Sequence, residues 1–284
     1  MRCTRGTFLL TLLMILAGCA TGPPAAGPLT EIETSRLYDA EQLLVRECVE
    51  RAGFKYWPVA RSSAAEHRKF PYGVEDVDWA RRHGYGIALE AKSRARDAQH
   101  PNRKYFSSLA PDQQEKYLST VNGPTPVGLT AQDVDGRLVT HSDQGCDAEA
   151  QRALYGDLPG WYRAIKLTNG LPRARALQVL KAESFQPLVA AWSRCMKSRG
   201  FDFIAPVESA RLMRHRTGLA PAEEIRTAIA EAECLHTSGL AAAAQTADRR
   251  VADEQRRQYK SELDTKLRLQ RAALPTALKV LERG

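Results

Sequence analysis

The chain carries one short sequence unit twice, and each copy is built around a cysteine. The stretch ECVERAGFKYWPV at 47–59 matches RCMKSRGFDFIAPV at 194–207 in its Cys, its Gly-Phe pair, a second aromatic residue and a closing Pro-Val. Before each cysteine, apolar residues recur every three or four positions, which is the spacing of one helix face. Because a left-handed glycine commonly ends a helix, Gly53 and Gly200 predict where both helices stop.

Helix signals continue through most of the sequence. Thr30 with Glu33 forms a capping box, which opens a long helix ahead of the first copy. From Leu240 onward the apolar spacing predicts one long helix, which we expect Pro275 to kink or end. The stretch 122–144 is the least helical, and its Asp-Gly dipeptide predicts a short hairpin.

The first residues have the form of an export signal. Two arginines precede an apolar run at 7–17, which is too short for the roughly 20 residues that cross a bilayer but fits a signal peptide. The run ends in LAGC at 16–19, which resembles the lipobox of bacterial lipoproteins. This resemblance implies cleavage before Cys19 and attachment of a lipid to its sulfur. A plain signal peptide with a chance cysteine, or a short buried helix, is the alternative.

Lipidation would anchor the protein durably, because two or three acyl chains hold far better than one. We therefore predict a signal peptide at 1–18, a Pro- and Gly-rich flexible tether at 19–30, and helical units at 31–157 and 158–284. No second apolar segment has the length of a membrane span. The expected location is the extracytoplasmic face of the cytoplasmic membrane in a monoderm host, or the outer membrane in a diderm host.

Export decides the expected role of the remaining cysteines. An even number of cysteines outside the cytoplasm favours two disulfides, with three ways to pair them. Since each repeat is followed by a further cysteine on an expected helix, we favour Cys48–Cys146 and Cys195–Cys234; pairing between the repeats is the alternative. The predicted fold class is all-α, mainly helical with short extended segments, in two disulfide-closed helical units with a long C-terminal helix.

Two motifs resemble those of uncharacterised secreted proteins and lipoproteins of actinobacteria. One is C-M-x-x-x-G-F-x-F at 195–203 with its variant at 48–56, and the other is YGVEDVDWARRHGYG at 72–86. The resemblance implies export, a helical disulfide architecture and the outer face of the cytoplasmic membrane, but no reaction. The first copy departs from the pattern at Val49, which stands where the second has Met; both residues are apolar.

Charge gives a weaker indication of partners. The formal net charge is +8, with basic and acidic residues mixed along the chain, as on a solvated helical surface. The alternative is attraction to anionic lipid headgroups or wall polymers. The C-terminal helix has a weakly apolar stripe flanked by basic residues, which we expect to pack on the second repeat. The alternative is a partner helix or an interfacial stripe at the membrane. We expect the membrane as partner through the anchor, a wall polymer or exported protein as a second partner, and no nucleic acid.

No catalytic or metal-binding pattern stands out in the sequence. There is no G-x-S-x-G, no H-E-x-x-H and no C-x-x-C, and we predict no catalytic residue, metal or cofactor. The stretch 131–142 lacks the first Asp and last Glu of a calcium loop. Residues 84–86 are too short to cradle a phosphate. Glu223 and Glu224 lie in the first turn of an expected helix, where they complement its dipole.

These observations favour a lipid-anchored envelope protein that binds or interacts and is not an enzyme. The alternative is an envelope hydrolase whose acid and base come together only on folding, acting on cell-wall material or peptide. Aromatic residues crowd the stretch 54–85, either as the core of the first unit or as the lining of a groove. The sequence names no ligand.

Overall fold

The computed structural model of the protein describes residues 27–61 and 68–284. The predicted signal peptide and Cys19 lie outside these residues, as does most of the predicted tether. The predicted all-α class is confirmed, and none of the described helices is long and apolar enough to cross a membrane. The helices are α1 (Glu31–Arg51), α3 (Val77–His83), α4 (Ile87–Gln99), α5 (Pro101–Ser108), α6 (Pro111–Asn122), α7 (Cys146–Tyr155), α8 (Leu158–Thr168), α9 (Leu171–Leu180), α10 (Gln186–Ser198), α11 (Pro206–His215), α12 (Pro221–Thr237), α13 (Leu240–Gln258) and α14 (Lys260–Leu281).

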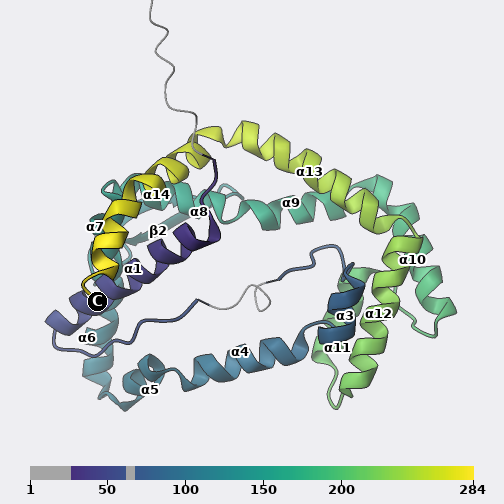
Figure 1. Cartoon of the computed structure of the whole chain (residues 1–284), viewed down its shortest axis with the longest axis horizontal. Coiled ribbons are helices and arrows are strands. Elements are labelled where there is room, and N and C mark those ends of the chain that lie inside the picture. The colour runs from purple at the N-terminus through teal and green to yellow at the C-terminus, as the bar shows by residue number, and fades with distance from the viewer. Residues whose placement is uncertain (1–26, 62–67) are drawn as a thin grey trace, which may run out of the picture.

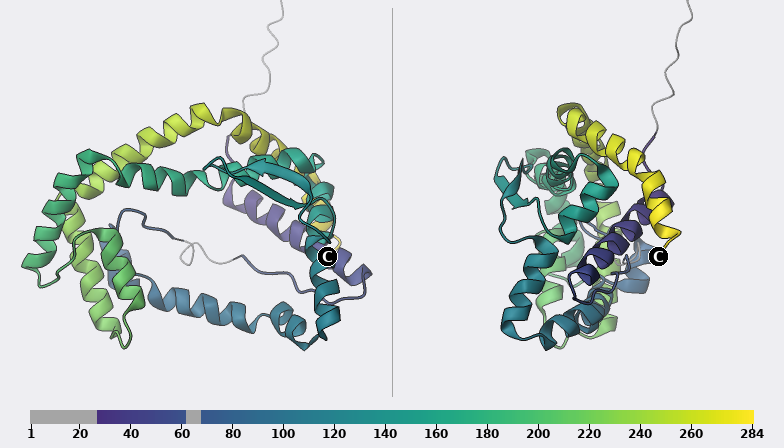
Figure 2. Two further views of the ribbon diagram at one scale, coloured as in Figure 1. Left: turned by 180° about the vertical axis from the view of Figure 1, so that it is seen from behind. Right: turned by 90° about the vertical axis from the view of Figure 1, so that its left-hand side faces the viewer.

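The helices form an elongated frame with a packed group at each end (Figure 1). We call α1, α6, α7, α8 and α14 the Cys48 end, and α3, α10, α11 and α12 the Cys195 end. Between the two ends, α9 and α13 run along one side of the frame in contact with each other, while α4 and α5 run along the other side (Figures 1 and 2).

Each end combines segments from distant parts of the chain. At the Cys48 end α14 packs on α1 and α8, and at the Cys195 end α3 packs on α12. Each end therefore contains residues from both sides of position 157, where the sequence analysis placed the boundary between two units. The two disulfide-closed units are interleaved in space.

The core of the Cys48 end depends on small residues where two long helices meet. Ala40 of α1 and Ala273 and Ala277 of α14 have no exposed surface, and Leu37 and Leu269 pack beside them. The distance between two helix axes depends on the side chains at their contact, so alanines let α1 and α14 approach closely. At the Cys195 end larger side chains fill the core, among them Trp192, Met196, Leu235 and Val251.

Both copies of the repeated unit end in the same hydrogen-bonding pattern. The N–H of Gly53 donates to the carbonyl oxygen of Glu50 at 3.0 Å, and the N–H of Phe54 donates to that of Val49 at 3.2 Å. With a φ of 85° at Gly53, this is a Schellman motif. The second copy forms the same two bonds through Lys197, Met196, Gly200 and Phe201. The predicted glycine stops are confirmed.

The predicted C-terminal helix is confirmed and consists of two consecutive segments that meet at Tyr259. α13 packs on α9, α10 and α12, whereas α14 packs on α1, α7 and α8. Pro275 does not end the helix, because α14 continues through it to Leu281. Ala273 and Ala277 bury the turns on both sides of the proline, and this packing holds the helix together there.

The predicted hairpin also forms. Strands β1 (Gly128–Gln132) and β2 (Leu138–Ser142) pair antiparallel, and Leu129 and Ala131 face α8. At the turn, the Asp133 carboxylate accepts hydrogen bonds from the N–H groups of Asp135 and Arg137 at 2.9 and 3.0 Å. The Asp-x-Asp-Gly sequence that suggested a partial calcium loop therefore forms a β-turn.

Candidate functional site

Each end of the frame contains one disulfide that joins two of its helices, and the pairing is the one that the sequence favoured. Cys48 bonds to Cys146 across 98 residues of chain, and Cys195 bonds to Cys234 across 39 residues. Cys146 and Cys234 are buried. In the chain-entropy model, loops of these lengths stabilise the folded state by about 4 to 5 kcal/mol each. Bonds this well buried serve as structural links between helices.

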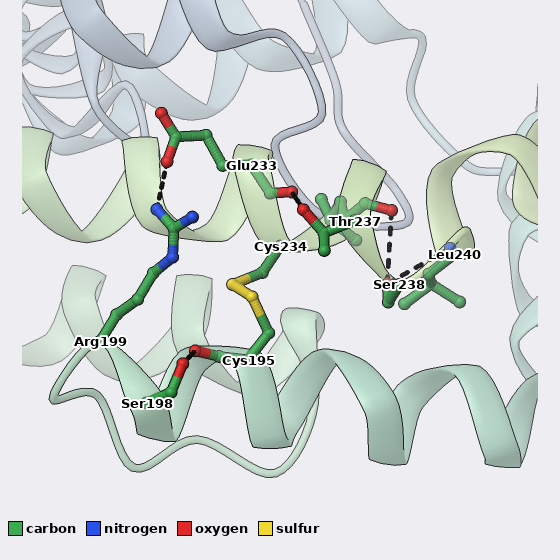
Figure 3. The surroundings of a disulfide bond; sticks show 9 residues. Cys195, Ser198, Arg199, Glu233, Cys234, Thr237, Ser238 and Leu240 are labelled. Atoms are coloured by element: carbon green, nitrogen blue, oxygen red, sulfur yellow. Dashed lines mark hydrogen bonds and ion pairs between the residues drawn. A yellow bond between two sulfur atoms is a disulfide. The ribbon is translucent and has the colours of Figure 1, made fainter.

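An ion pair accompanies each disulfide. Arg51 of α1 pairs with Glu149 of α7 beside the first bond. Arg199, directly after α10, pairs with Glu233 of α12 beside the second bond (Figure 3). These side chains are substantially exposed, and exposed pairs contribute ~1 kcal/mol or less. The pairs reinforce the helix contacts and form no reactive site.

A buried cluster of polar side chains lies at the Cys195 end. Glu231 of α12 has no exposed surface, and its Oε1 accepts a hydrogen bond from the N–H of Val74 at 2.8 Å. Its Oε2 lies 2.6 Å from the hydroxyl oxygen of Tyr85 and also contacts the Ser209 hydroxyl. Burial raises the pKa of Glu231 to about 7.

The Ser209 hydroxyl lies between two acceptors, the Glu231 carboxyl group and the carbonyl oxygen of Pro206. Its oxygen is 2.8 Å from the Pro206 oxygen, and its one hydrogen can be donated to only one of the two acceptors at a time. Burial, together with the nearby Glu231, raises the pKa of the Tyr85 hydroxyl. The cluster is therefore a buried network whose polar atoms are hydrogen-bonded to one another and to the backbone.

Glu224 lies seven residues before Glu231 on the same helix and holds the neighbouring turn. Its Oε1 accepts hydrogen bonds from the N–H groups of Tyr85 and Ile87 at 2.8 and 3.3 Å. At Gly84, with a φ of 55°, an added Cβ would lie 2.6 Å from that oxygen. The Gly-Tyr-Gly motif is thus a backbone turn fitted to an acidic side chain.

The sequence analysis missed this role of both acidic residues. It assigned Glu224 to the helix dipole and did not single out Glu231 or Ser209. A signal was present, because Glu231 interrupts the apolar face formed by Ala228, Ala232 and Leu235. A charged residue on such a face is expected to have a buried partner.

A cavity of about 660 Å³ lies directly beside this cluster. The segment from Arg68 to Val74, the turn from Tyr85 to Glu90, and helices α3, α9 and α11 line it. Val74 and Tyr85 belong both to the cavity wall and to the Glu231 network. Pockets that bind small molecules measure ~300–1,000 Å³.

The aromatic cluster predicted at 54–85 divides between the two ends. Phe54 packs edge-on against Tyr117 in the core of the Cys48 end, with ring centroids 5.5 Å apart. Phe70 and Trp79, with centroids 5.4 Å apart, line the cavity at the Cys195 end. Phe54 therefore belongs to the core of the Cys48 end, whereas Phe70, Trp79 and Tyr85 belong to the core of the Cys195 end and also line the cavity.

Among residues 27–61 and 68–284, no group of three or more His, Cys, Asp and Glu could hold a metal ion. No family model, curated protein or solved structure matches this chain. The fold and site define a mainly helical protein with two disulfide-bridged ends, a closed carboxyl–hydroxyl network and an adjoining cavity.

Proposed function

We propose that the protein is a lipid-anchored envelope protein that binds a ligand in the cavity at the Cys195 end and carries out no reaction on it. One observation supports this most directly: Glu231 and Ser209, the carboxyl and hydroxyl groups of the buried network, do not line the cavity. Glu231 and Ser209 have no exposed surface. A general acid or base must come within hydrogen-bonding reach of its substrate, directly or through one water.

The carboxylate that does line the cavity is already bound. Glu90 accepts a hydrogen bond from Arg214 at 3.0 Å, in a pair whose side chains are about two-fifths exposed. An envelope hydrolase, the alternative, would need a second carboxylate or a nucleophile beside it. Among the described lining residues there is neither a second carboxylate nor a serine, cysteine or histidine.

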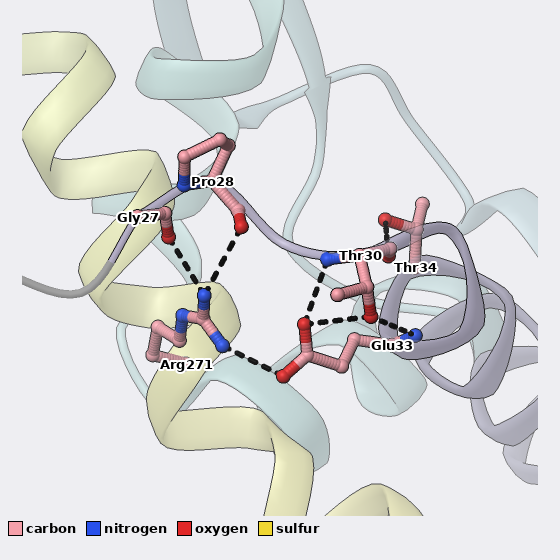
Figure 4. A network of polar contacts seen from close by, with 6 residues as sticks. All are labelled: Gly27, Pro28, Thr30, Glu33, Thr34 and Arg271. Carbon is pink, nitrogen blue, oxygen red and sulfur yellow. Dashed lines mark hydrogen bonds and ion pairs between the residues drawn. The ribbon is translucent and has the colours of Figure 1, made fainter.

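The start of the described chain supports the anchored arrangement. Arg271 of α14 donates hydrogen bonds to the carbonyl oxygens of Gly27 and Pro28 at 2.7 and 3.2 Å, and to Glu33 at 2.7 Å (Figure 4). The chain therefore leaves the folded body at a fixed point. A fully extended stretch from Cys19 to Gly27 spans at most about 28 Å, which would hold the body close to the membrane.

Anchoring is tested by fractionating cells that produce Cys19→Ala, with Cys3→Ala in the predicted signal peptide as the matched control. We expect the wild-type chain and Cys3→Ala to be processed, lipid-modified at Cys19 and recovered with membranes. Cys19→Ala is expected to carry no lipid and to remain uncleaved at this site. Cleavage before residue 19 with full membrane recovery of Cys19→Ala would contradict the proposal.

The absence of a reaction is tested by incubating the purified protein with peptidoglycan fragments and with an unfolded peptide. We expect no bond cleavage above that of a blank, in both wild-type protein and Glu231→Gln. Cleavage by the wild-type protein that Glu231→Gln abolishes would establish the hydrolase instead.

A further inference from the structure

We propose that the cavity at the Cys195 end binds an anionic amphiphile, an apolar chain or ring system that carries one carboxylate or phosphate group. This inference rests on the proposed binding function and names its ligand class. Two lining helices, the charges of the lining residues and the aromatic floor each support it.

The first wall is one face of α9. Arg173, Ala176, Leu177 and Leu180 all line the cavity, and they follow one another at the spacing i, i+3, i+4 and i+7. Residues at this spacing share one face of a helix. Leu177 is 41% exposed, so this apolar face is only partly covered by other parts of the protein. The wall is apolar toward the C-terminal end of α9 and basic toward its start.

The second wall, on α11, has the same composition. Val207, Ala210 and Arg214 lie at i, i+3 and i+7 and line the cavity, and Val207 is 49% exposed. On each wall an arginine lies seven positions from an apolar side chain, about 10 Å along the helix. A ligand that is apolar over a comparable length and ends in an acidic group would match both walls.

The lining residues carry an excess of positive charge. Four are basic, namely Arg68, Lys69, Arg173 and Arg214, and the one acidic residue among them is Glu90. Two of the cations have close carboxylate partners: Arg214 with Glu90 at 3.0 Å and Arg68 with Asp76 at 2.7 Å.

The other two cations remain available to a ligand. Arg173 lies 3.7 Å from Asp135, at the outer range of an ion pair, and it is 72% exposed. Lys69 has no carboxylate partner within the described part of the chain. An anion that enters the cavity would therefore pair first with Lys69 and Arg173.

The floor of the cavity is aromatic. Phe70 and Trp79 lie side by side, and the Arg68 guanidinium lies over both rings, 4.8 and 5.3 Å from their centroids. Such a floor suits an alkyl chain or a ring. Asn169 contributes the one neutral amide side chain among the described lining residues, and the Tyr85 hydroxyl is bonded to Glu231. A neutral sugar would therefore find few hydrogen-bonding partners.

The inference is tested by calorimetric titration of the chain without its predicted signal peptide. The probes are dodecyl phosphate and laurate below their micellar concentrations, dodecan-1-ol below its solubility limit, and inorganic phosphate. We expect both acidic amphiphiles to bind at least tenfold more tightly than dodecan-1-ol, and inorganic phosphate not to bind. Equal binding of dodecyl phosphate and dodecan-1-ol, or no binding of either acidic amphiphile, would overturn the proposal.

Two variants test whether the ligand binds in the cavity. Ala176→Trp fills the space between the walls and is expected to abolish binding, whereas Ala95→Trp, on the exposed face of α4, is its control. The double variant Lys69→Gln/Arg173→Gln is expected to weaken dodecyl phosphate binding at least tenfold without changing that of dodecan-1-ol. Arg256→Gln/Arg257→Gln, at exposed positions on α13, is the matched control because it also removes two positive charges. Binding unchanged in Ala176→Trp would contradict the assignment.

The source of the amphiphile and the proposed function are tested separately. Transfer of phosphatidylglycerol from vesicles to the protein identifies a membrane lipid, and binding of dodecyl phosphate without such transfer identifies a free amphiphile; both support the shared chemistry. Release of phosphate from dodecyl phosphate would instead overturn the proposed non-enzymatic function. Failure of all binding would leave the anchoring result at Cys19 unaffected.

Discussion

The Oε2 atom of Glu231 lies 2.6 Å from the hydroxyl oxygen of Tyr85, a residue 146 positions earlier in the chain. This contact fixes the Gly-Tyr-Gly turn on α12 and thereby forms the edge of the cavity. Since the network contains one titratable carboxyl group with no exposure to water, its protonation is coupled directly to folding.

The first prediction concerns pH. Folding raises the pKa of Glu231 from 4.5 to about 7, so the folded state binds this proton more tightly than the unfolded state. The resulting stabilisation is fully present below pH 4.5 and is lost as pH rises through 7, by up to about 3 kcal/mol. Glu231→Gln, which cannot titrate, is expected to remove this part of the pH dependence.

Urea unfolding at pH 5 and pH 8 under non-reducing conditions measures the effect. Glu115→Gln, at an exposed position on α6, is the control and is expected to keep the wild-type pH dependence. Burial also raises the pKa of Glu41 and Asp147 at the Cys48 end, so the informative quantity is the difference between wild-type protein and Glu231→Gln. An equal pH dependence in both proteins would show that Glu231 does not titrate with folding.

The second prediction concerns the Gly-Tyr-Gly turn. Gly84→Ala places a Cβ 2.6 Å from Glu224 Oε1, whereas Gly218→Ala, also at positive φ, meets nothing within 4 Å. Both variants place a side chain on a residue with positive φ, but only Gly84→Ala also places it against the Glu224 carboxylate. We expect it to destabilise the fold by about 1 to 3 kcal/mol more than Gly218→Ala. Thermal unfolding of the two variants in parallel provides the measurement, and equal losses would contradict the close contact.

The third prediction assigns each disulfide to one end of the frame. Cys195→Ser/Cys234→Ser removes the link between α10 and α12 and is expected to destabilise the fold by about 4 kcal/mol. Hydrogen exchange should increase most in these two helices. In Cys48→Ser/Cys146→Ser the increase should instead be largest in α1 and α7. An equal increase in both pairs of helices in each variant would argue against this local effect.

The fourth prediction concerns an ion pair that joins three segments. Asp248 Oδ1 of α13 accepts hydrogen bonds from the Tyr72 hydroxyl at 2.6 Å and from Arg175 Nε of α9 at 2.9 Å. In a double-mutant cycle, Tyr72→Phe and Asp248→Asn are expected to couple by about 1 kcal/mol. Tyr72→Phe combined with Asp253→Asn, on the same helix without contact to Tyr72, is the control and should be additive. Additivity in both cycles would show that the bond to Tyr72 adds no stability.

Local sequence signals predicted much of the fold, because they depend on residues that are close together in the chain. The capping box of Thr30 and Glu33, the glycine stop at Gly53, and the hairpin turn after Asp133 all form as expected. The disulfide pairing followed from the order of cysteines and repeats. For the capping box, the glycine stop and the turn, the stabilising partner lies within a few residues. For the disulfides, only three pairing schemes of four cysteines had to be compared.

The interleaving of the two ends and the cavity were not predictable in the same way. α3 has an apolar face that would fit several partners, and nothing in its sequence specifies α12. The cavity forms where Phe70, Trp79, Leu177 and Val207 meet, and these residues come from segments far apart in the chain. Pro275 shows the converse: its local tendency to end a helix is outweighed by the burial of Ala273 and Ala277.

The hydrogen bonds from Arg271 to Gly27 and Pro28 have a mechanical consequence. If the protein is anchored as proposed, a force exerted through the tether acts on the folded part first at these residues. Part of that load passes through Arg271 into the last helix, in addition to the load carried along α1. Because α1 and α14 pack along each other, the force is resisted by their whole interface at once. In the proposed anchored form, the two ends of the described chain would therefore bear this force together.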